Sequence, residues 1–112
     1  MPCLFCQISQ NKIPSNAQLD TKDLFAFDDI HPKAPVHILI IPKKHIPSTA
    51  EVSEADIEIL GKMILSAKKL AEKLNINQTG YRLIFNTKNH GGQIVDHIHL
   101  HLIGGKQLGP MA

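Results

Sequence analysis

The sequence predicts one α+β domain with a five-stranded antiparallel sheet, one long helix covering one face of it, and a short N-terminal helix. Two observations predict this class. Five short segments have the composition of strands and are joined by short connections, and one longer segment repeats its apolar residues with helical spacing. With 112 residues, the chain fits a single domain, residues 1–112, and leaves no room for a second.

The first half of the chain predicts a short helix followed by three strands. Residues 3–16 begin with an apolar run that allows one or two helical turns before Pro14. Ala17–Asp20 and Leu24–Asp28 are strand candidates separated by a polar turn. A proline-bounded loop then leads to Val36–Pro42, whose β-branched and apolar residues are typical of a central strand.

The second half predicts the long helix and two further strands. Ser53, with Asp56 three residues later, resembles a capping box at the start of the helix. An apolar stripe at helical spacing should pack against the sheet. Its members are Leu60, Met63, Ile64, Ala67, Ala71 and Leu74. Gly80–Asn86 is the fourth strand, and a polar loop with two glycines separates it from the last strand, at roughly 96–103.

Composition argues against several classes of protein. An apolar fraction of 43% supports a real core, and a formal net charge of +2 is too small to favour a nucleic-acid partner. The N-terminus turns polar by Gln7, unlike a secretory signal, and no apolar run approaches the length of a membrane span. We therefore expect a cytoplasmic protein without a membrane partner, in which Cys3 and Cys6 are thiols or metal ligands rather than a disulfide.

Three of the seven histidines alternate with aliphatic residues near the C-terminus. In "DHIHLHLIGG", His97, His99 and His101 would share one face of a strand, and the residues between them would face the helix. Three interpretations fit. The imidazoles could be buried without chemistry, although each would then need its own polar partner. Alternate histidines can also bind zinc with a third ligand elsewhere. In the third interpretation, a neutral imidazole attacks phosphorus while its neighbours orient it and protonate the leaving group.

The same residues resemble those of a known family. "HIHLHLI" fits the signature of the histidine-triad (HIT) family. "AFDDIHPKAPVHILIIPKKHI" and "GYRLIFNTKNHGGQ" resemble the family's central block and the stretch before the triad, and "HLIGGKQLGP" is similar to the ending of its bacterial Hint branch. The resemblance covers nearly the whole chain. It implies a compact α+β protomer and, in this branch, a homodimer with a continuous ten-stranded sheet.

The resemblance implies catalytic roles for four histidines. His99, the middle histidine of the triad, would attack the α-phosphorus of the substrate and form a nucleotidyl-histidine intermediate. His101 would contact the phosphate and the leaving group, and His97 would hold the geometry of the site. His37 matches a further active-site histidine on the neighbouring strand.

The resemblance also implies a site for a purine nucleotide, such as AMP, GMP or their amides. Asp29 would accept hydrogen bonds from the ribose hydroxyls, and backbone N–H groups around Gly92 and Gln93 would approach a phosphate. The other positions that match nucleotide contacts of the family are Ile30, Phe5, Ile8, Phe27 and Asn86. Two positions depart from the pattern: Ile94 replaces a serine that often contacts the phosphate, and Asp96 replaces a residue that is often aromatic.

The pair Cys3 and Cys6 has three interpretations. A redox pair of the thioredoxin kind normally follows a strand and opens a helix, a context that is missing here. The thiols can also be small buried side chains, or two ligands of a zinc ion. Some relatives in the wider superfamily bind zinc through such a pair and two histidines, which would be His45 and His97 here. The family activity requires no cofactor, so a zinc ion would be structural.

The activity that the resemblance implies is hydrolysis of the P–N bond of AMP-amides such as AMP-lysine, and of acyl-AMP. This is the activity of a purine nucleoside phosphoramidase. The alternatives are hydrolysis of dinucleoside polyphosphates, as in the Fhit branch, and a nucleotide-binding or interaction module without turnover. The ending "LIGGKQLGP" favours the Hint branch, and an intact triad together with His37 favours an enzyme.

Overall fold

The computed structural model of the protein describes residues 3–112 and confirms the α+β class. Its helices and strands, in chain order, are α1 (Leu4–Ser9), β1 (Ala17–Asp20), β2 (Leu24–Asp28), β3 (Val36–Pro42), α2 (Ile57–Lys73), β4 (Tyr81–Phe85) and β5 (Leu100–Gly104). Short 3-10 turns lie at Thr49–Glu51, Glu54–Asp56 and Asn89–Gly91. The first three strands begin and end where the sequence predicts.

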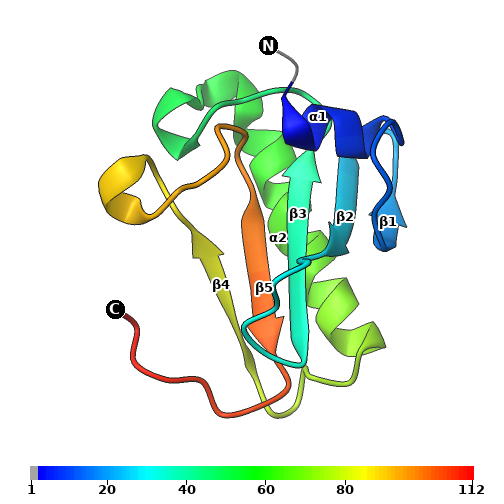
Figure 1. The fold of residues 1–112 in the computed structure, drawn as a ribbon, viewed down its shortest axis with the longest axis vertical. Coiled ribbons are helices and arrows are strands. Elements are labelled where there is room, and N and C mark those ends of the chain that lie inside the picture. The colour runs from blue at the N-terminus through cyan, green and yellow to red at the C-terminus, as the bar shows by residue number, and fades with distance from the viewer. Residues whose placement is uncertain (1–2) are drawn as a thin grey trace.

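The sheet is antiparallel throughout and runs in the order β1-β2-β3-β5-β4. β3 is therefore central, which fits its continuous apolar sequence, and β4 is an edge strand (Figure 1). α2 crosses one face of the sheet, while α1 lies over one end of β2 and β3 on the other face (Figure 1).

Alternate residues of the strands form two separate cores, one on each face of the sheet. The core under α2 is built from Leu24, Ala26, Ile38, Ile40, Leu100 and Leu102 of the strands and Met63, Ala67, Leu70 and Ala71 of the helix. The core under α1 is built from Phe5, Ile8, Phe25, Phe27, Leu39 and Ile41. Leu39 pairs with His101 across β3 and β5, and His37 lies two residues before Leu39. Both histidines therefore lie on the α1 face.

The long helix differs from its prediction in the centre of its buried stripe. Leu70 is buried at 4% exposed, whereas Ile64, expected in the stripe, is 50% exposed. The predicted capping box is present, since the Ser53 N–H donates to Asp56 Oδ2 at 3.0 Å. It closes a 3-10 turn that leads into α2, so the helix itself begins at Ile57.

The last strand starts later than the sequence predicts, at Leu100 instead of Asp96. The Ile98 N–H donates to Ile46 O at 2.7 Å and the His97 N–H donates to Val95 O at 2.9 Å, so this stretch bonds outside the sheet. His97 and His99 consequently lie just before β5, and only His101 belongs to the strand. The expectation that all three histidines stand on one regular strand is wrong.

Candidate active site and metal cluster

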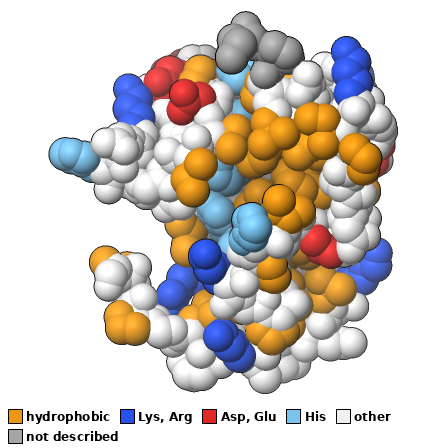
Figure 2. All heavy atoms as spheres, in the orientation of Figure 1, with side chains coloured by type: hydrophobic (Ala, Val, Ile, Leu, Met, Phe, Trp, Pro, Cys, Tyr) orange, Lys and Arg blue, Asp and Glu red, His pale blue; other side chains and the backbone are white. Residues whose placement is uncertain are grey.

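Four side chains converge on the α1 face beside the central strands. His37 comes from β3, His101 comes from β5, His99 lies immediately before β5, and Asp29 follows β2. The rings of His99 and His101 have centroids 5.0 Å apart, and those of His37 and His101 are 5.2 Å apart. Figure 2 shows histidine side chains gathered on this face beside a broad apolar surface.

The bonds of His37 fix the proton positions on two of these rings. The Lys33 N–H donates to His37 Nδ1 at 3.0 Å, so neutral His37 carries its proton on Nε2. That Nε2 lies 2.9 Å from His101 Nδ1 and 3.4 Å from Asp29 Oδ2. Since His101 Nδ1 accepts the bond, neutral His101 carries its own proton on Nε2.

A backbone carbonyl fixes His99 in the opposite tautomer. His99 Nδ1 lies 2.7 Å from His97 O, which can only accept, so the proton of neutral His99 is on Nδ1. Its Nε2 therefore has a free lone pair, as a nucleophilic imidazole requires. The Phe5 ring meets His99 edge-on, with centroids 5.0 Å apart and an interplanar angle of 89°, and thereby restricts the orientation of the imidazole.

The site keeps its imidazoles uncharged. Burial lowers the pKa of His37, His97 and His99 below the usual 6.5. Burial, followed by the proximity of His99 and His37, lowers the pKa of His101 to about 4. All four rings are therefore neutral at neutral pH, so the lone pair of His99 is not blocked by a proton.

The expected nucleoside contacts fall into an exposed and a buried group. Ile30 is 85% exposed, whereas Asp29 is half-buried, with Oδ1 accepting a bond from the His31 N–H at 2.8 Å and Oδ2 facing His37 Nε2. Phe5, Ile8 and Phe27, in contrast, are buried together in the core under α1. The amide nitrogen of Asn86 lies 3.5 Å from His101 Nε2.

The glycine-containing loop is held by its own hydrogen bonds. The N–H groups of Gly92 and Gln93 donate to Asn89 O and Lys88 O, both at 3.0 Å. The amides expected to meet a phosphate are therefore occupied within the loop. The Gln93 side chain donates to Pro47 O and Val95 O and accepts from the Lys88 N–H, so it fixes the shape of the loop.

Both departures from the family pattern are at the surface. Ile94 is 92% exposed, and Asp96 is exposed.

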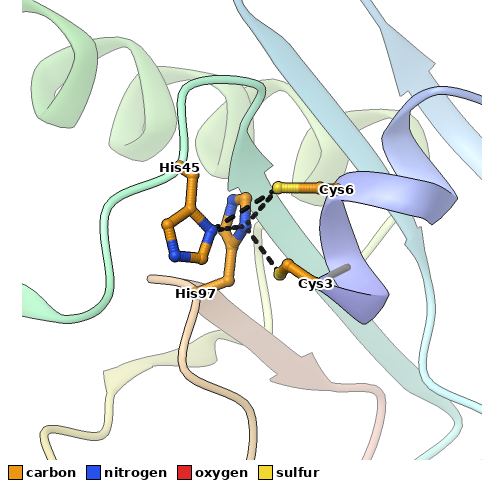
Figure 3. A group of neighbouring side chains, drawn as sticks. All are labelled: Cys3, Cys6, His45 and His97. Atoms are coloured by element: carbon orange, nitrogen blue, oxygen red, sulfur yellow. Dashed lines mark hydrogen bonds between the residues drawn. The ribbon is translucent and has the colours of Figure 1, made fainter. Parts of the chain in front are cut away.

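Cys3, Cys6, His45 and His97 form a second cluster next to the histidine site, here called the metal cluster. Their side chains point toward one another (Figure 3), and their donor atoms all lie within 4.8 Å of one another. His97 Nδ1 lies 3.4 Å from Cys3 Sγ, 3.5 Å from Cys6 Sγ and 3.2 Å from His45 Nδ1. Cys6 Sγ is also 3.5 Å from His45 Nδ1.

These distances fit a tetrahedral zinc ion. Bond lengths of about 2.3 Å to sulfur and 2.0–2.1 Å to nitrogen place sulfur and nitrogen ligands about 3.6 Å apart and two nitrogens about 3.3 Å apart. His97 also has the tautomer that a ligand needs. Its Nε2 lies 2.8 Å from Pro42 O and must donate, which leaves Nδ1 with a lone pair facing the other three donors.

The backbone partners of the histidines were not predicted from the sequence. They are the Lys33 N–H, the Pro42 carbonyl and the His97 carbonyl. Every residue offers the same backbone groups, so no residue type could have indicated them.

The family model of the HIT domain matches residues 10–108, and the chain belongs to this family. Among curated relatives, it is 50% identical over 108 residues to the purine nucleoside phosphoramidase of Escherichia coli (strain K12), covering 96% of this chain and 91% of that protein.

Solved structures agree with this assignment. A HIT family hydrolase from Legionella pneumophila Philadelphia 1 has a TM-score of 0.95 at 49% identity, covering 96% of each chain. A histidine triad protein from Clostridium difficile has a TM-score of 0.96 at 37% identity, covering 100% of this chain and 97% of that one. Within residues 3–112, no helix has the length and apolar character needed to cross a membrane.

Proposed function

We propose that the protein is a purine nucleoside phosphoramidase that hydrolyses the P–N bond of AMP-amides, and acyl-AMP, through a nucleotidyl-histidine on His99. The observation that carries the proposal is the 2.7 Å bond from His99 Nδ1 to His97 O, which leaves Nε2 free to attack. The 50% identity to a phosphoramidase that covers 91% of that protein supports this substrate class.

The proposed reaction has two displacement steps on phosphorus. His99 Nε2 bonds to the α-phosphorus, the P–N bond breaks, and the amine leaves with one added proton. His101 supplies this proton after the anionic phosphoryl group has favoured its charged form. Water then loses a proton to His101 while its oxygen displaces His99 Nε2, which yields AMP and free enzyme.

The other proposed contacts serve the nucleotide. Asp29 and Ile30 would hold the ribose side, and Asn86 would lie beside the phosphate. The Gly92–Gln93 loop would lie next to it, with its amide N–H groups still bonded to Asn89 O and Lys88 O. Phe5, Ile8 and Phe27 form the apolar support for the base, because they make one buried cluster on this face.

The decisive experiment compares wild type with His99→Ala on an AMP-amide of lysine and on a diadenosine polyphosphate, following AMP release. We expect wild type to prefer the amide and His99→Ala to lose at least about a hundredfold in turnover. His90→Ala, which removes an exposed histidine to which the proposed reaction assigns no role, is the matched control. Equal turnover by His99→Ala and wild type overturns the nucleophile, preference for the polyphosphate favours the Fhit-like reaction, and AMP binding without turnover favours a binding module.

The leaving-group role of His101 has its own test. His101→Ala should remain fast on substrates whose leaving group needs no proton and should slow on amines. An equal loss on both kinds of substrate contradicts the acid role.

We further propose that the metal cluster holds one structural zinc ion. Support comes from the two thiols, the two imidazole nitrogens and their near-tetrahedral spacing. Zinc bound there would join the N-terminal segment to the residues before β5. Metal analysis of protein purified without chelator should find about one zinc per chain in wild type and little in Cys6→Ser. Wild type without zinc contradicts the proposal.

We also propose a homodimer. β4 is an edge strand with unpaired backbone groups, and α2 exposes Ile57, Ile64 and Leu65 at 66%, 50% and 50%. Light scattering after gel filtration should give twice the chain mass for wild type and a smaller mass for Ile64→Glu. A monomeric wild type refutes this assembly.

We also propose that the protein acts in the cytoplasm and that it binds neither nucleic acid nor membranes. This proposal is supported by the small net charge and the free thiols.

A further inference from the structure

We propose that the metal cluster couples zinc binding to nucleotide binding, so that zinc and the nucleotide raise each other's affinity through α1 and His97. The identity of the nucleotide rests on the proposed function. The four ligands of the metal cluster are attached to the histidine site through α1 and His97.

α1 is held in place mainly by the packing of its side chains against the sheet. It has six residues and no side-chain hydrogen bond at its N-cap, Cys3, and a helix this short is unstable by itself. Its position depends on the packing of Phe5 and Ile8 into the core. A metal bound by Cys3 and Cys6 adds a cross-link from α1 to His45 and His97, on two distant parts of the chain.

Phe5 is the first link between the metal cluster and the nucleophile. It lies between the two cysteines in the sequence, and its ring meets both His99, at 5.0 Å, and Phe27, at 5.5 Å. Fixing both cysteines therefore fixes the ring that restrains His99 and supports the proposed base site. A loosely held α1 leaves Phe5 with more freedom, and a nucleotide must then spend part of its binding free energy on ordering it.

His97 is the second link. Its ring faces the two thiols and His45 through Nδ1, while its own carbonyl accepts the Nδ1 proton of His99. One residue thus holds the metal with its side chain and the nucleophile with its backbone. Cys3, Cys6 and His45 are positioning residues in this scheme, because they act on the nucleotide site only through α1 and His97.

Coupling of this kind is reciprocal. If zinc raises the affinity for AMP by some factor, AMP raises the affinity for zinc by the same factor. Couplings between sites in proteins commonly lie between about 5-fold and 150-fold. We expect each affinity to rise by a factor of at least about 5 here, because Phe5 and His97 both contact His99.

The experiment measures, on the wild-type chain, the effect of AMP on the affinity for zinc and the effect of zinc on the affinity for AMP. The affinity for zinc is measured by competition with a chromogenic chelator, with and without saturating AMP. The affinity for AMP is measured by calorimetry on zinc-loaded and zinc-free protein. We expect both affinities to rise by the same factor, and zinc removal to raise KM for an AMP-amide more than it lowers kcat.

Two variants separate coupling from a general loss of structure. Cys6→Ser should bind AMP as weakly as zinc-free wild type and should not respond to added zinc. Leu4→Ala, which truncates an exposed side chain of α1, should keep the full coupling. Far-UV circular dichroism of each variant must match wild type.

The outcomes are distinct. If AMP binds zinc-free and zinc-loaded protein equally well, the coupling is overturned and the proposed function stands. If AMP binds neither form, the proposed function fails and the coupling fails with it. If the chain binds AMP but no zinc, the proposed zinc site and its coupling are refuted and the proposed function is not.

Discussion

Protonation of His101 should destabilise the fold in mild acid. The pKa of His101 is about 4 in the folded protein, against an ordinary value of 6.5. Between these two pH values, His101 is protonated in the unfolded chain and neutral in the folded protein. The contribution of His101 is therefore fully favourable above pH 6.5 and is lost as the pH falls toward 4. The window of about 2.5 units corresponds to about 3 kcal/mol, of which about 2 kcal/mol is already lost near pH 5.

The perturbation is His101→Gln, which removes the titrating group and keeps a polar side chain. Urea unfolding, followed by circular dichroism, is measured on chelator-treated wild type and variant from about pH 7.5 to about pH 4.5. Chelator treatment keeps zinc release out of the comparison. Over this range wild type should lose about 2 to 3 kcal/mol more than the variant. His37, His97 and His99 should destabilise both proteins in the same direction, because their pKa values are also lowered.

His90→Gln is the matched control for this comparison, because it makes the same histidine-to-glutamine change at an exposed position. If the curves of wild type and His101→Gln run parallel, His101 titrates normally in the folded protein. Burial would then not be what keeps the imidazole of His101 neutral.

Three further changes test the packing, the helix start and the metal cluster. Met63→Ala removes a fully buried side chain under the sheet and should lower the free energy of unfolding by about 2–5 kcal/mol in urea titrations; a cost below about 1 kcal/mol contradicts the packing. Ser53→Ala opens the capping box with Asp56 and should cost about 1 kcal/mol by the same assay, whereas Ser53→Asp should restore most of it. In protein loaded with the proposed zinc ion, peroxide should oxidise the Cys3 and Cys6 thiolates to a disulfide, with the peroxide reduced to water and the zinc released to a chromogenic chelator. Zinc that stays bound after both thiols are lost contradicts this expectation.

The first three strands were the part of the fold most easily predicted from the sequence. Ala17–Asp20, Leu24–Asp28 and Val36–Pro42 are bounded by polar turns or prolines, which mark where each strand must end. The centre of the helix stripe was harder to predict. Helical spacing allows both Ile64 and Leu70, and only contact with the sheet decides that Leu70 is buried.

The start of the last strand could not be read from residue types. The alternation of histidines and aliphatic residues continues through His97, but the Ile98 N–H bonds to Ile46 O instead of a neighbouring strand. This contact joins residues more than fifty positions apart, and no local pattern indicates it. The bonded amides of Gly92 and Gln93 are a similar case, because a glycine pair predicts an accessible backbone and does not reveal which carbonyls occupy it.

The structure ties the proposed chemistry of the histidines to the backbone. The Lys33 N–H and the Pro42 and His97 carbonyls hold His37, His97 and His99 in defined tautomers. Substituting neighbouring side chains therefore cannot easily invert these tautomers, since the partners are peptide groups that every sequence carries. Burial lowers the pKa of His99 and His101, and it thereby keeps the Nε2 lone pair of His99, the proposed nucleophile, free of a proton. A variant that tolerates acid better by exposing these rings should consequently lose part of the restraint on His99, so acid tolerance and catalytic rate should oppose each other in this protein.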